Sequence, residues 1–138
     1  MRRDKVEIRV LSPGEIEEFH AHLLRLDRTS RFPRMDDRAI DAHCLRLMAI
    51  GAILVGCFVD GVMRASAEII PDRTARRAEA AITIEDGYED RDFEREITDV
   101  IVEQARRYHL LDLRVLDHAN TRTYRIPPFE LKVYAANG

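Results

Sequence analysis

The sequence predicts one α+β domain, in which helices pack against a mixed and mostly antiparallel β-sheet. Three observations lead to this prediction. Strand-like segments recur along the chain, and two of them flank Asp60-Gly61, a turn sequence typical of a β-hairpin. Segments with the spacing of an amphipathic helix lie between other strands. The 138 residues, 46% of them hydrophobic, can bury roughly two-thirds of the surface of the unfolded chain, which is enough for one core.

The N-terminal third is expected to form a strand and two helices. Residues 6–11 (VEIRVL) alternate as a half-buried strand does. Ser12, Pro13 and Glu15 then give a capping box with proline at the first helical position, followed by an apolar stripe of Ile16, Phe19, Leu23, Leu24 and Leu26. Residues 27–35 are typical of a loop. Asp36 or Asp37 can cap a second helix, whose apolar face carries Ile40, Cys44, Leu47 and Met48.

The middle of the chain predicts three antiparallel strands. Residues 49–59 are continuously apolar, and residues 62–70 (VMRASAEII) return after the hairpin turn. A loop with a basic cluster then leads to a third strand at residues 78–84 (AEAAITI). Consecutive strands with short connections usually lie side by side, so these three should form a meander.

The C-terminal part predicts a helix, a parallel strand and an irregular end. Apolar residues recur at helical spacing at Phe93, Ile97, Val100, Ile101, Ala105 and Tyr108. Residues 111–116 (LDLRVL) alternate as a strand, which a crossover helix places parallel to residues 78–84. Residues 120–126 are expected to form two helical turns that Pro127-Pro128 ends, and residues 129–135 alternate as a last strand.

Composition excludes several classes of function. A net charge of −3 leaves no basic footprint for nucleic acid, and no apolar run approaches the ~20 residues that span a bilayer. Because the N-terminus also lacks a signal peptide, we expect a cytoplasmic protein without a membrane partner. Cys44 and Cys57 lie in apolar contexts without CxxC spacing, which favours reduced core residues over a metal site. None of the five histidines stands beside a recognisable nucleophile.

The junction at residues 84–97 (IEDGYEDRDFEREI) carries an unusual charge. A strand that runs into a helix N-terminus normally suits an anion, because the first helical turn has free N–H groups and a positive dipole end. Here seven acids face Arg91 and Arg95, a net charge of −5. The acids can belong to a solvated helix start that Asp90 or Asp92 caps, to a remodelled anion site, or to a site for a cation or basic partner.

The order of elements resembles that of the GNAT superfamily of acyl-CoA-dependent N-acyltransferases, over about the first 125 residues. Three stretches carry the resemblance: GAILVGCFVDGVMRASAEII is similar to the second and third strands of that family, AEAAITIEDGYEDRDFEREI to its fourth strand and cofactor loop, and RRYHLLDLRVLDHANTRTY to its fifth strand and the start of its fourth helix. The resemblance implies a sheet splayed between strands four and five, with acetyl-CoA in the gap and a small-molecule or peptide amine as acceptor.

The resemblance also assigns site residues. The family's pyrophosphate loop has Gln or Arg, two residues, Gly, one residue, then Gly or Ala, and this pattern falls on residues 89–94. Here Glu89 takes the basic or amide position, and Asp92 and Glu94 take the glycine positions. A carboxylate ~5 Å from a phosphate repels it by roughly 3 kcal/mol at an effective dielectric constant of about 20. The implied cofactor contacts are Ile82, Ile84, Glu89, Arg91, Asp92, Phe93, Glu94 and Asn120.

Acylation of an amine needs a base for the ammonium and an acid for the departing thiolate. Glu68 and Glu79 are the candidate bases on strands that should pair, and Tyr124, four residues after Asn120, is the candidate acid that the resemblance implies; each can also be an ordinary surface residue. Two functions follow: an acetyl-CoA-dependent N-acyltransferase, or a non-catalytic binding or regulatory module without a cofactor. The single strand expected at residues 129–135 leaves a sheet edge on which a homodimer can form.

Overall fold

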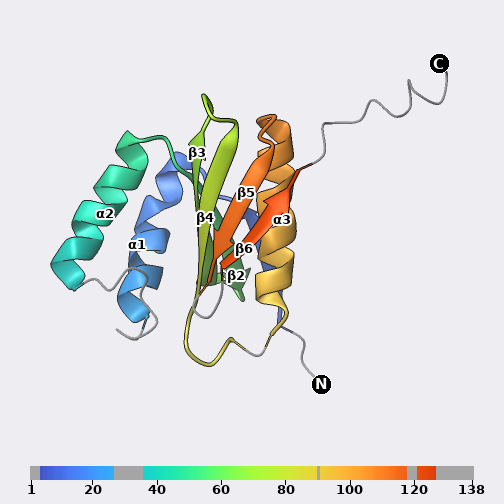
Figure 1. Cartoon of the computed structure of the whole chain (residues 1–138). Coiled ribbons are helices and arrows are strands. Elements are labelled where there is room, and N and C mark those ends of the chain that lie inside the picture. The colour runs from blue at the N-terminus through green and yellow to red at the C-terminus, as the bar shows by residue number, and fades with distance from the viewer. Residues whose placement is uncertain (1–3, 27–35, 90, 118–120, 127–138) are drawn as a thin grey trace, which may run out of the picture.

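The computed structural model describes residues 4–26, 36–89, 91–117 and 121–126 (Figure 1). Three α-helices, one 3₁₀ turn and six strands occur in these segments. In chain order they are β1 (Val6–Val10), η1 (Pro13–Glu15), α1 (Ile16–Arg25), α2 (Asp37–Ala49), β2 (Ile53–Val59), β3 (Val62–Asp72), β4 (Arg77–Ile84), α3 (Phe93–Arg107), β5 (Asp112–Leu116) and β6 (Thr121–Arg125). None of these helices combines the length and the apolar character that a bilayer-spanning segment requires.

The strands form one sheet in the order β1-β2-β3-β4-β5-β6, and every neighbouring pair is antiparallel except β4 and β5. Helices α1 and α2 lie on one face of the sheet and α3 lies on the other (Figure 1). The meander, the parallel crossover through α3 and the mixed sheet confirm the predicted fold class.

The end of the described chain corrects one expectation. Residues 121–125, expected within two helical turns, form strand β6 and pair with β5 from Leu116↔Thr121 to Asp112↔Arg125. Threonine and tyrosine favour a strand, and the alternation of exposed Thr121, Thr123 and Arg125 with half-buried Arg122 and Tyr124 has the period of a strand. The free edge of β5 supplies the hydrogen-bond partners. The strand expected at residues 129–135 lies outside the described residues.

Strands β4 and β5 are paired over only part of their length. The pairs run from Arg77↔Asp112 to Ala81↔Leu116, and β4 continues to Ile84 after β5 has ended. A parallel pair that stops three residues before one strand ends opens a gap at the level of Ala81. The predicted splay between these strands therefore begins there.

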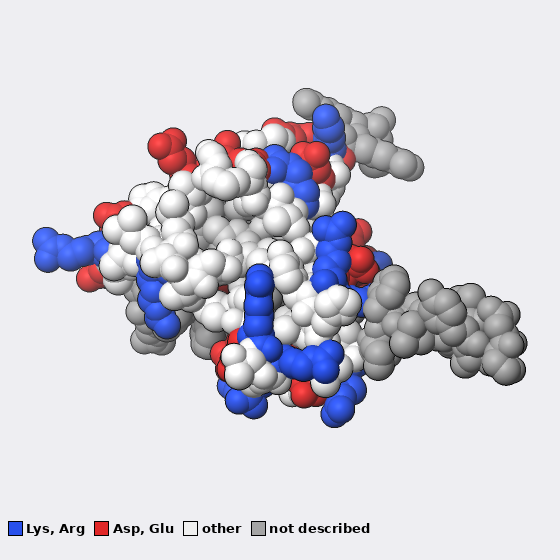
Figure 2. Space-filling view, turned by 90° about the horizontal axis from the view of Figure 1, so that it is seen from above, with Lys and Arg blue, Asp and Glu red and all other residues white. Residues whose placement is uncertain are grey.

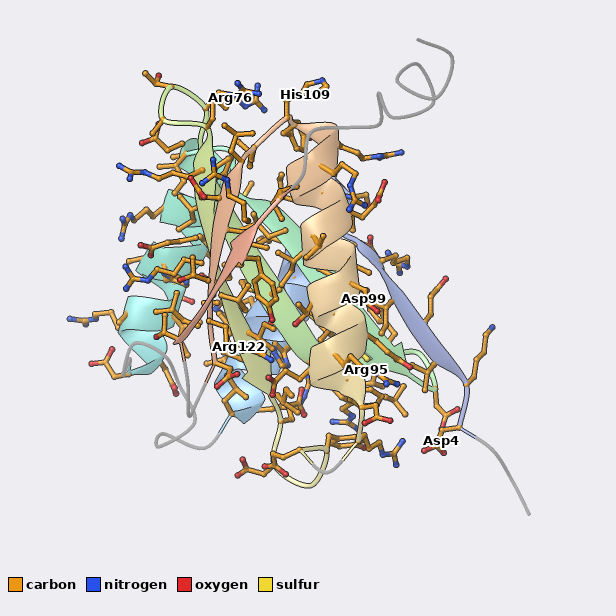
Figure 3. The ribbon with its side chains drawn as sticks, turned by 45° about the vertical axis from the view of Figure 1, so that its right-hand side comes forward. Asp4, Arg76, Arg95, Asp99, His109 and Arg122 are labelled. Atoms are coloured by element: carbon orange, nitrogen blue, oxygen red, sulfur yellow. The ribbon has the colours of Figure 1, made fainter. Side chains whose placement is uncertain are left out.

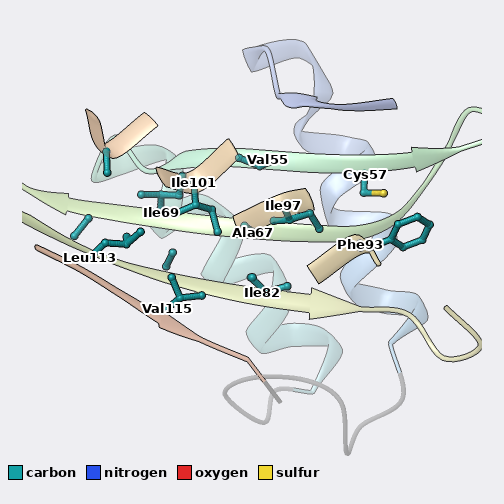
Figure 4. Packing of buried hydrophobic residues seen from close by; sticks show 14 of the residues in the cluster. Val55, Cys57, Ala67, Ile69, Ile82, Phe93, Ile97, Ile101, Leu113 and Val115 are labelled. Atoms are coloured by element: carbon teal, nitrogen blue, oxygen red, sulfur yellow. The ribbon is translucent and has the colours of Figure 1, made fainter. Parts of the chain in front are cut away.

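Each face of the sheet has its own apolar core. Between the sheet and α3, Val55, Ala67, Ile69, Ile97, Ile101, Leu113 and their neighbours form the larger cluster (Figure 4). Phe19, Leu23, Ile40, Leu47, Phe58 and Met63 form the second cluster, under α1 and α2. The two cysteines are free and buried, one in each cluster. Burial raises the pKa of Cys44 to about 11 and that of Cys57 to about 12, so both stay protonated as predicted for core residues.

The helix starts on the α1 face follow their capping signals. The predicted capping box is present, with the Ser12 N–H donating to Glu15 Oε1 at 2.9 Å. Of the two aspartates proposed to cap α2, Asp36 does so by accepting a hydrogen bond from the Ala39 N–H at 2.8 Å. These caps satisfy N–H groups that have no partner within the helix.

A chain of buried polar side chains joins α1 to the sheet. His22 of α1 is fully buried; its Nδ1 lies 2.8 Å from Glu85 Oε2 and its Nε2 lies 3.1 Å from the Thr83 hydroxyl. The Thr83 hydroxyl lies 2.9 Å from that of Ser66 on β3. Arg25 and Arg64 bind the same Glu85 carboxylate at about 3 Å, so three basic side chains meet one acid.

The protonation of this cluster follows from its surroundings. Burial alone would raise the pKa of Glu85, but hydrogen bonds from His22, Arg25 and Arg64 lower it from the ordinary 4.5 to about 2. Burial lowers the pKa of His22, against the opposing effect of the Glu85 carboxylate. Glu85 is therefore an anion at neutral pH, and the two arginines supply most of its counter-charge.

Replacing Glu85 with glutamine should destabilise the fold by about 3 kcal/mol, because the cationic partners lose a buried counter-charge. A group whose pKa is lowered on folding stabilises the protein above its unfolded pKa, so the Glu85 contribution is full above about pH 5 and is lost as the pH falls toward 2. Denaturant unfolding of wild type and Glu85→Gln at pH 7, 5 and 3 should show a difference that shrinks with acid. Glu79→Gln is the control, because Glu79 is an exposed carboxylate on β4, the strand that Glu85 directly follows. Equal effects of both variants would contradict this role for Glu85.

Candidate functional site

The candidate site lies at the junction between β4 and α3, where the sequence places its acidic stretch. The loop turns at Gly87, whose φ is +88°, a value that glycine adopts without strain. The Tyr88 N–H donates to the Glu85 carbonyl at 3.1 Å, so the buried Glu85 also anchors the loop. The Gly87 N–H donates to Glu89 Oε2 at 2.9 Å. Glu89 thus folds back on its own loop.

The N-terminus of α3 has no side-chain cap among the residues described. Asp92 occupies the cap position, as predicted, yet its carboxylate accepts no hydrogen bond from the first turn. It lies instead 3.6 Å from the Arg95 guanidinium. Asp90, the other proposed cap, lies outside the described residues. The N–H groups of this turn and the dipole end are therefore available to an anion.

A pocket of about 410 Å³ lies beside this helix start. Figure 3 labels three of its residues, Arg95, Asp99 and Arg122, which gather around the N-terminal half of α3. Four acids and three arginines line it in all, together with Thr98, Val102 and Tyr124: the acids are Glu89, Asp92, Glu94 and Asp99, and the arginines are Arg91, Arg95 and Arg122.

The arginines are held by acids from near and far in the sequence. Arg122 of β6 contacts Glu94 and lies 3.4 Å from Asp117, while its own Nε is buried and has no hydrogen-bond partner in the described part of the chain. Arg91 binds Asp4 at 2.7 Å and covers the ring of Tyr88. Burial and the nearby Asp117 raise the pKa of Glu94, against the effect of Arg122. The net charge of the pocket lining is therefore far smaller than the sequence of the junction indicates.

The register places the two candidate bases on one face of the sheet, the face under α1 and α2. Glu68 pairs with Ala81, and Glu79 pairs with Ile70. Glu68 is buried at 6% exposure, and its Oε1 lies 2.8 Å from Nε2 of His43 on α2. The side chain of Glu79 is 58% exposed and lies 3.6 Å from Arg114. Only Glu68 therefore combines burial with a position at the level where β4 and β5 part.

The other predicted site residues lie on the α3 side. Tyr124 points to this face, where it packs against the larger core and lines the pocket. Ile82 and Phe93 are buried in that core, and Ile84 is packed against it. Asn120 lies outside the described residues. Glu68 and Tyr124 are thus on opposite faces of the sheet.

Three histidines that the sequence did not single out contact carboxylates: His20 contacts Asp41, His22 contacts Glu85 and His43 contacts Glu68. His22 follows Phe19 by three residues on α1, and His43 follows Ile40 by three residues on α2. In both cases this spacing was a usable signal that the histidine lies on the apolar face of its helix. A chain of hydrogen bonds runs from Ser66 through Thr83 and His22 to Glu85, and its order is similar to that of a nucleophile, a base and an acid. Ser66 and His22, however, have no exposed surface that a substrate could contact. Among the residues described, no three His, Cys, Asp or Glu side chains are grouped to hold a metal ion.

Neither the family models nor the curated protein sequences include a match to this chain. Solved structures do match it. A GNAT-family N-acetyltransferase (YhbS) from Escherichia coli, in complex with CoA, superposes with a TM-score of 0.69 at 12% identity, over 92% of this chain and 84% of that one. The PaiA N-acetyltransferase from Thermoplasma acidophilum, in complex with coenzyme A, gives 0.62 at 15% identity, over 97% and 89%.

A GNAT-family acetyltransferase from Streptococcus pneumoniae gives a TM-score of 0.59 at 17% identity, over 80% of this chain and 74% of that one. Identities this low carry information about the fold and none about activity. The agreement extends over most of each chain and includes the strand order and the crossover through α3. The chain therefore has the fold of the GNAT superfamily.

Proposed function

We propose that the protein is an acyl-CoA-dependent N-acyltransferase that holds the cofactor phosphates at the start of α3. The observation that carries this proposal is Arg122, which lies on the wall of the pocket with a buried Nε–H that has no acceptor among the residues that the structure describes. A buried donor without a partner is unfavourable, and a phosphate oxygen would remove that cost. Arg91, Arg95 and the uncapped N-terminus of α3 add positive charge around the same pocket.

The acids at the glycine positions remain the main opposition to a phosphate. Two features reduce that opposition. Asp92 and Glu94 each lie beside an arginine, so an incoming anion meets ion pairs rather than isolated carboxylates. The raised pKa of Glu94 also means that this carboxyl can take up a proton more readily than an ordinary glutamate when Arg122 turns to a phosphate.

Two side chains support the transfer step of this proposal. A bound acyl-CoA would supply a thioester activated toward attack by an amine. Glu68 is suited to accept the proton of that amine, because it is buried, is held by His43 and lies at the level where β4 and β5 part. Tyr124 lines the pocket on the opposite face, where its hydroxyl is suited to protonate a thiolate. Glu79 is less suited as the base because of its exposure and its ion pair with Arg114.

A second candidate is a non-catalytic binding or regulatory module that has lost its cofactor. The observation in its favour is the separation of Glu68 and Tyr124 by the sheet, together with the carboxylates where close approach to phosphate is needed. In this case the ion pairs around α3 only stabilise the junction, and acyl transfer is absent.

Calorimetry with acetyl-CoA and with CoA tests the binding step. We expect saturable binding that weakens about tenfold or more in Arg122→Gln, because a charged contact to phosphate is lost. Arg114→Gln, on the neighbouring strand but outside the pocket, should bind as the wild type does. At a hundred times its Kd the ligand should add ~2.7 kcal/mol to the free energy of unfolding. If millimolar ligand gave neither heat of binding nor a shift in unfolding temperature, the acyltransferase function would be excluded.

Restoring glycine at the two acidic positions should tighten binding. In the double variant Asp92→Gly with Glu94→Gly, the repulsion of phosphate is removed and the backbone can approach more closely, so we expect the Kd for CoA to fall at least tenfold. In the same titration, this gain in affinity should be smaller at 200 mM salt than at 20 mM salt, because salt screens the repulsion that the substitutions remove. An unchanged Kd would mean that these acids do not face the cofactor.

The role of Glu68 separates the two candidates. If the protein acylates amines, Glu68→Gln should lower kcat by about 10²- to 10⁴-fold with little change in CoA affinity, and Glu79→Gln should leave kcat near the wild-type value. Release of CoA from acetyl-CoA, measured with a panel of amines, gives the rates. Tight CoA binding without transfer to any amine of the panel would favour the non-catalytic module.

A further inference from the structure

A second pocket lies at the opposite end of α3 from the proposed cofactor site. Its volume is about 410 Å³, within the range of small-molecule sites. It is enclosed by the ends of α2 and α3, the start of β2, and the turn between β1 and α1. Gln104 and Tyr108, which form its α3 wall, follow Phe93 by 11 and 15 residues, or about 16 to 22 Å along a helix. The two pockets are therefore separate.

The lining of this second pocket is apolar and carries no charged side chain. Thirteen residues line it, and most are hydrophobic, including Leu47 and Met48 of α2 and Ile53 and Leu54 of β2. Figure 2 looks down on this end of the molecule and shows uncharged residues over its centre, with Lys, Arg, Asp and Glu toward the margin. A charged ligand would lose its hydration here without gaining a counter-charge, so the pocket suits a neutral one.

One polar side chain in the pocket has no partner. Gln104 is buried at 8% exposure, and no hydrogen bond joins its carboxamide to any residue of the described segments. The carboxamide atoms are not among the fully buried side-chain atoms without a partner, so they reach the pocket and can form hydrogen bonds with what enters it. Leucine or methionine would complete the apolar lining at this helical position, so the amide marks the point at which a ligand can form a hydrogen bond.

We propose that this pocket binds a neutral small molecule with an apolar body and one amide group. A carboxamide both donates and accepts, and a secondary amide offers the matching acceptor and donor to Gln104. The apolar body would contact Leu47, Met48, Ile53 and Leu54. This site is independent of acyl transfer, because it shares no lining residue with the pocket at the start of α3.

Methyl NMR of the full chain with N-phenylbutanamide as probe tests the proposal. We expect saturable shifts of the Met48, Ile53 and Leu54 methyls, with a Kd below about 1 mM, and an unshifted Ile97 methyl near the other end of α3. The similarly sized anion 5-phenylpentanoate should bind at least tenfold more weakly. Equal binding of the anion, or no shift at millimolar probe, would overturn the proposal. Displacement of the probe by acetyl-CoA would overturn the separation of the two sites.

Gln104→Met keeps the volume and removes the amide. It should weaken N-phenylbutanamide binding by about five- to tenfold, because the hydrogen bonds to the probe are lost, and it should not lower the unfolding temperature, because the side chain forms no hydrogen bond to the described residues. Glu103→Met, the neighbouring residue outside the pocket, is the matched control and should change neither the Kd nor the direction of the methyl shifts. Unweakened probe binding in Gln104→Met, or a lower unfolding temperature, would show that Gln104 is structural.

Discussion

The buried carboxylate of Glu85 is the constraint on which the rest of this structure depends. It directly follows β4, its carboxylate binds His22 and Arg25 of α1 and Arg64 of β3, and its backbone bonds both Arg64 and Tyr88. One residue thus ties the α1 layer to the sheet and fixes the path of the chain toward α3. The Glu85 carboxylate has three partners in a site nearly closed to water. These contacts hold the surrounding side chains in one arrangement, which an exposed ion pair would not do.

That fixed path determines where the acidic junction meets the rest of the molecule. Beyond Glu85, Asp92 lies near Arg95 and Glu94 contacts Arg122 of β6, while Arg91 is held by Asp4 before β1. The pocket lining, with four acids and three arginines, therefore carries a net charge of −1, against −5 for the junction sequence. A ligand at the start of α3 would meet acids and arginines that already form ion pairs with one another.

The sequence predicted the fold well because its local signals agreed with the tertiary structure. The hairpin turn, the capping box and the crossover helix each specified one element of the structure. The order of these elements along the chain was compatible with a single mixed sheet. The prediction failed at residues 121–125, where strand propensity and the open edge of β5 outweighed the two helical turns expected for residues 120–126. That error hid Arg122, since its role depends on β6. The pairings of Glu68 with His43 and of Glu85 with His22 join residues 25 and 63 positions apart, and no periodicity reports such contacts.

The arrangement around α3 also bears on why the junction is acidic. Within the described residues, capping does not explain the acids, since Asp92 occupies the cap position without accepting a hydrogen bond. Three arginines gathered around one pocket would repel one another without counter-charges, and the carboxylates supply these. The buried guanidinium N–H of Arg122 has no acceptor among the described residues, but the same is true of Arg64 in the Glu85 cluster, so this feature alone does not distinguish a binding site from a structural set of pairs. The proposed anion site therefore depends on where Arg122 lies, on the wall of the pocket beside the start of α3, where the acids act as counter-ions of the arginines.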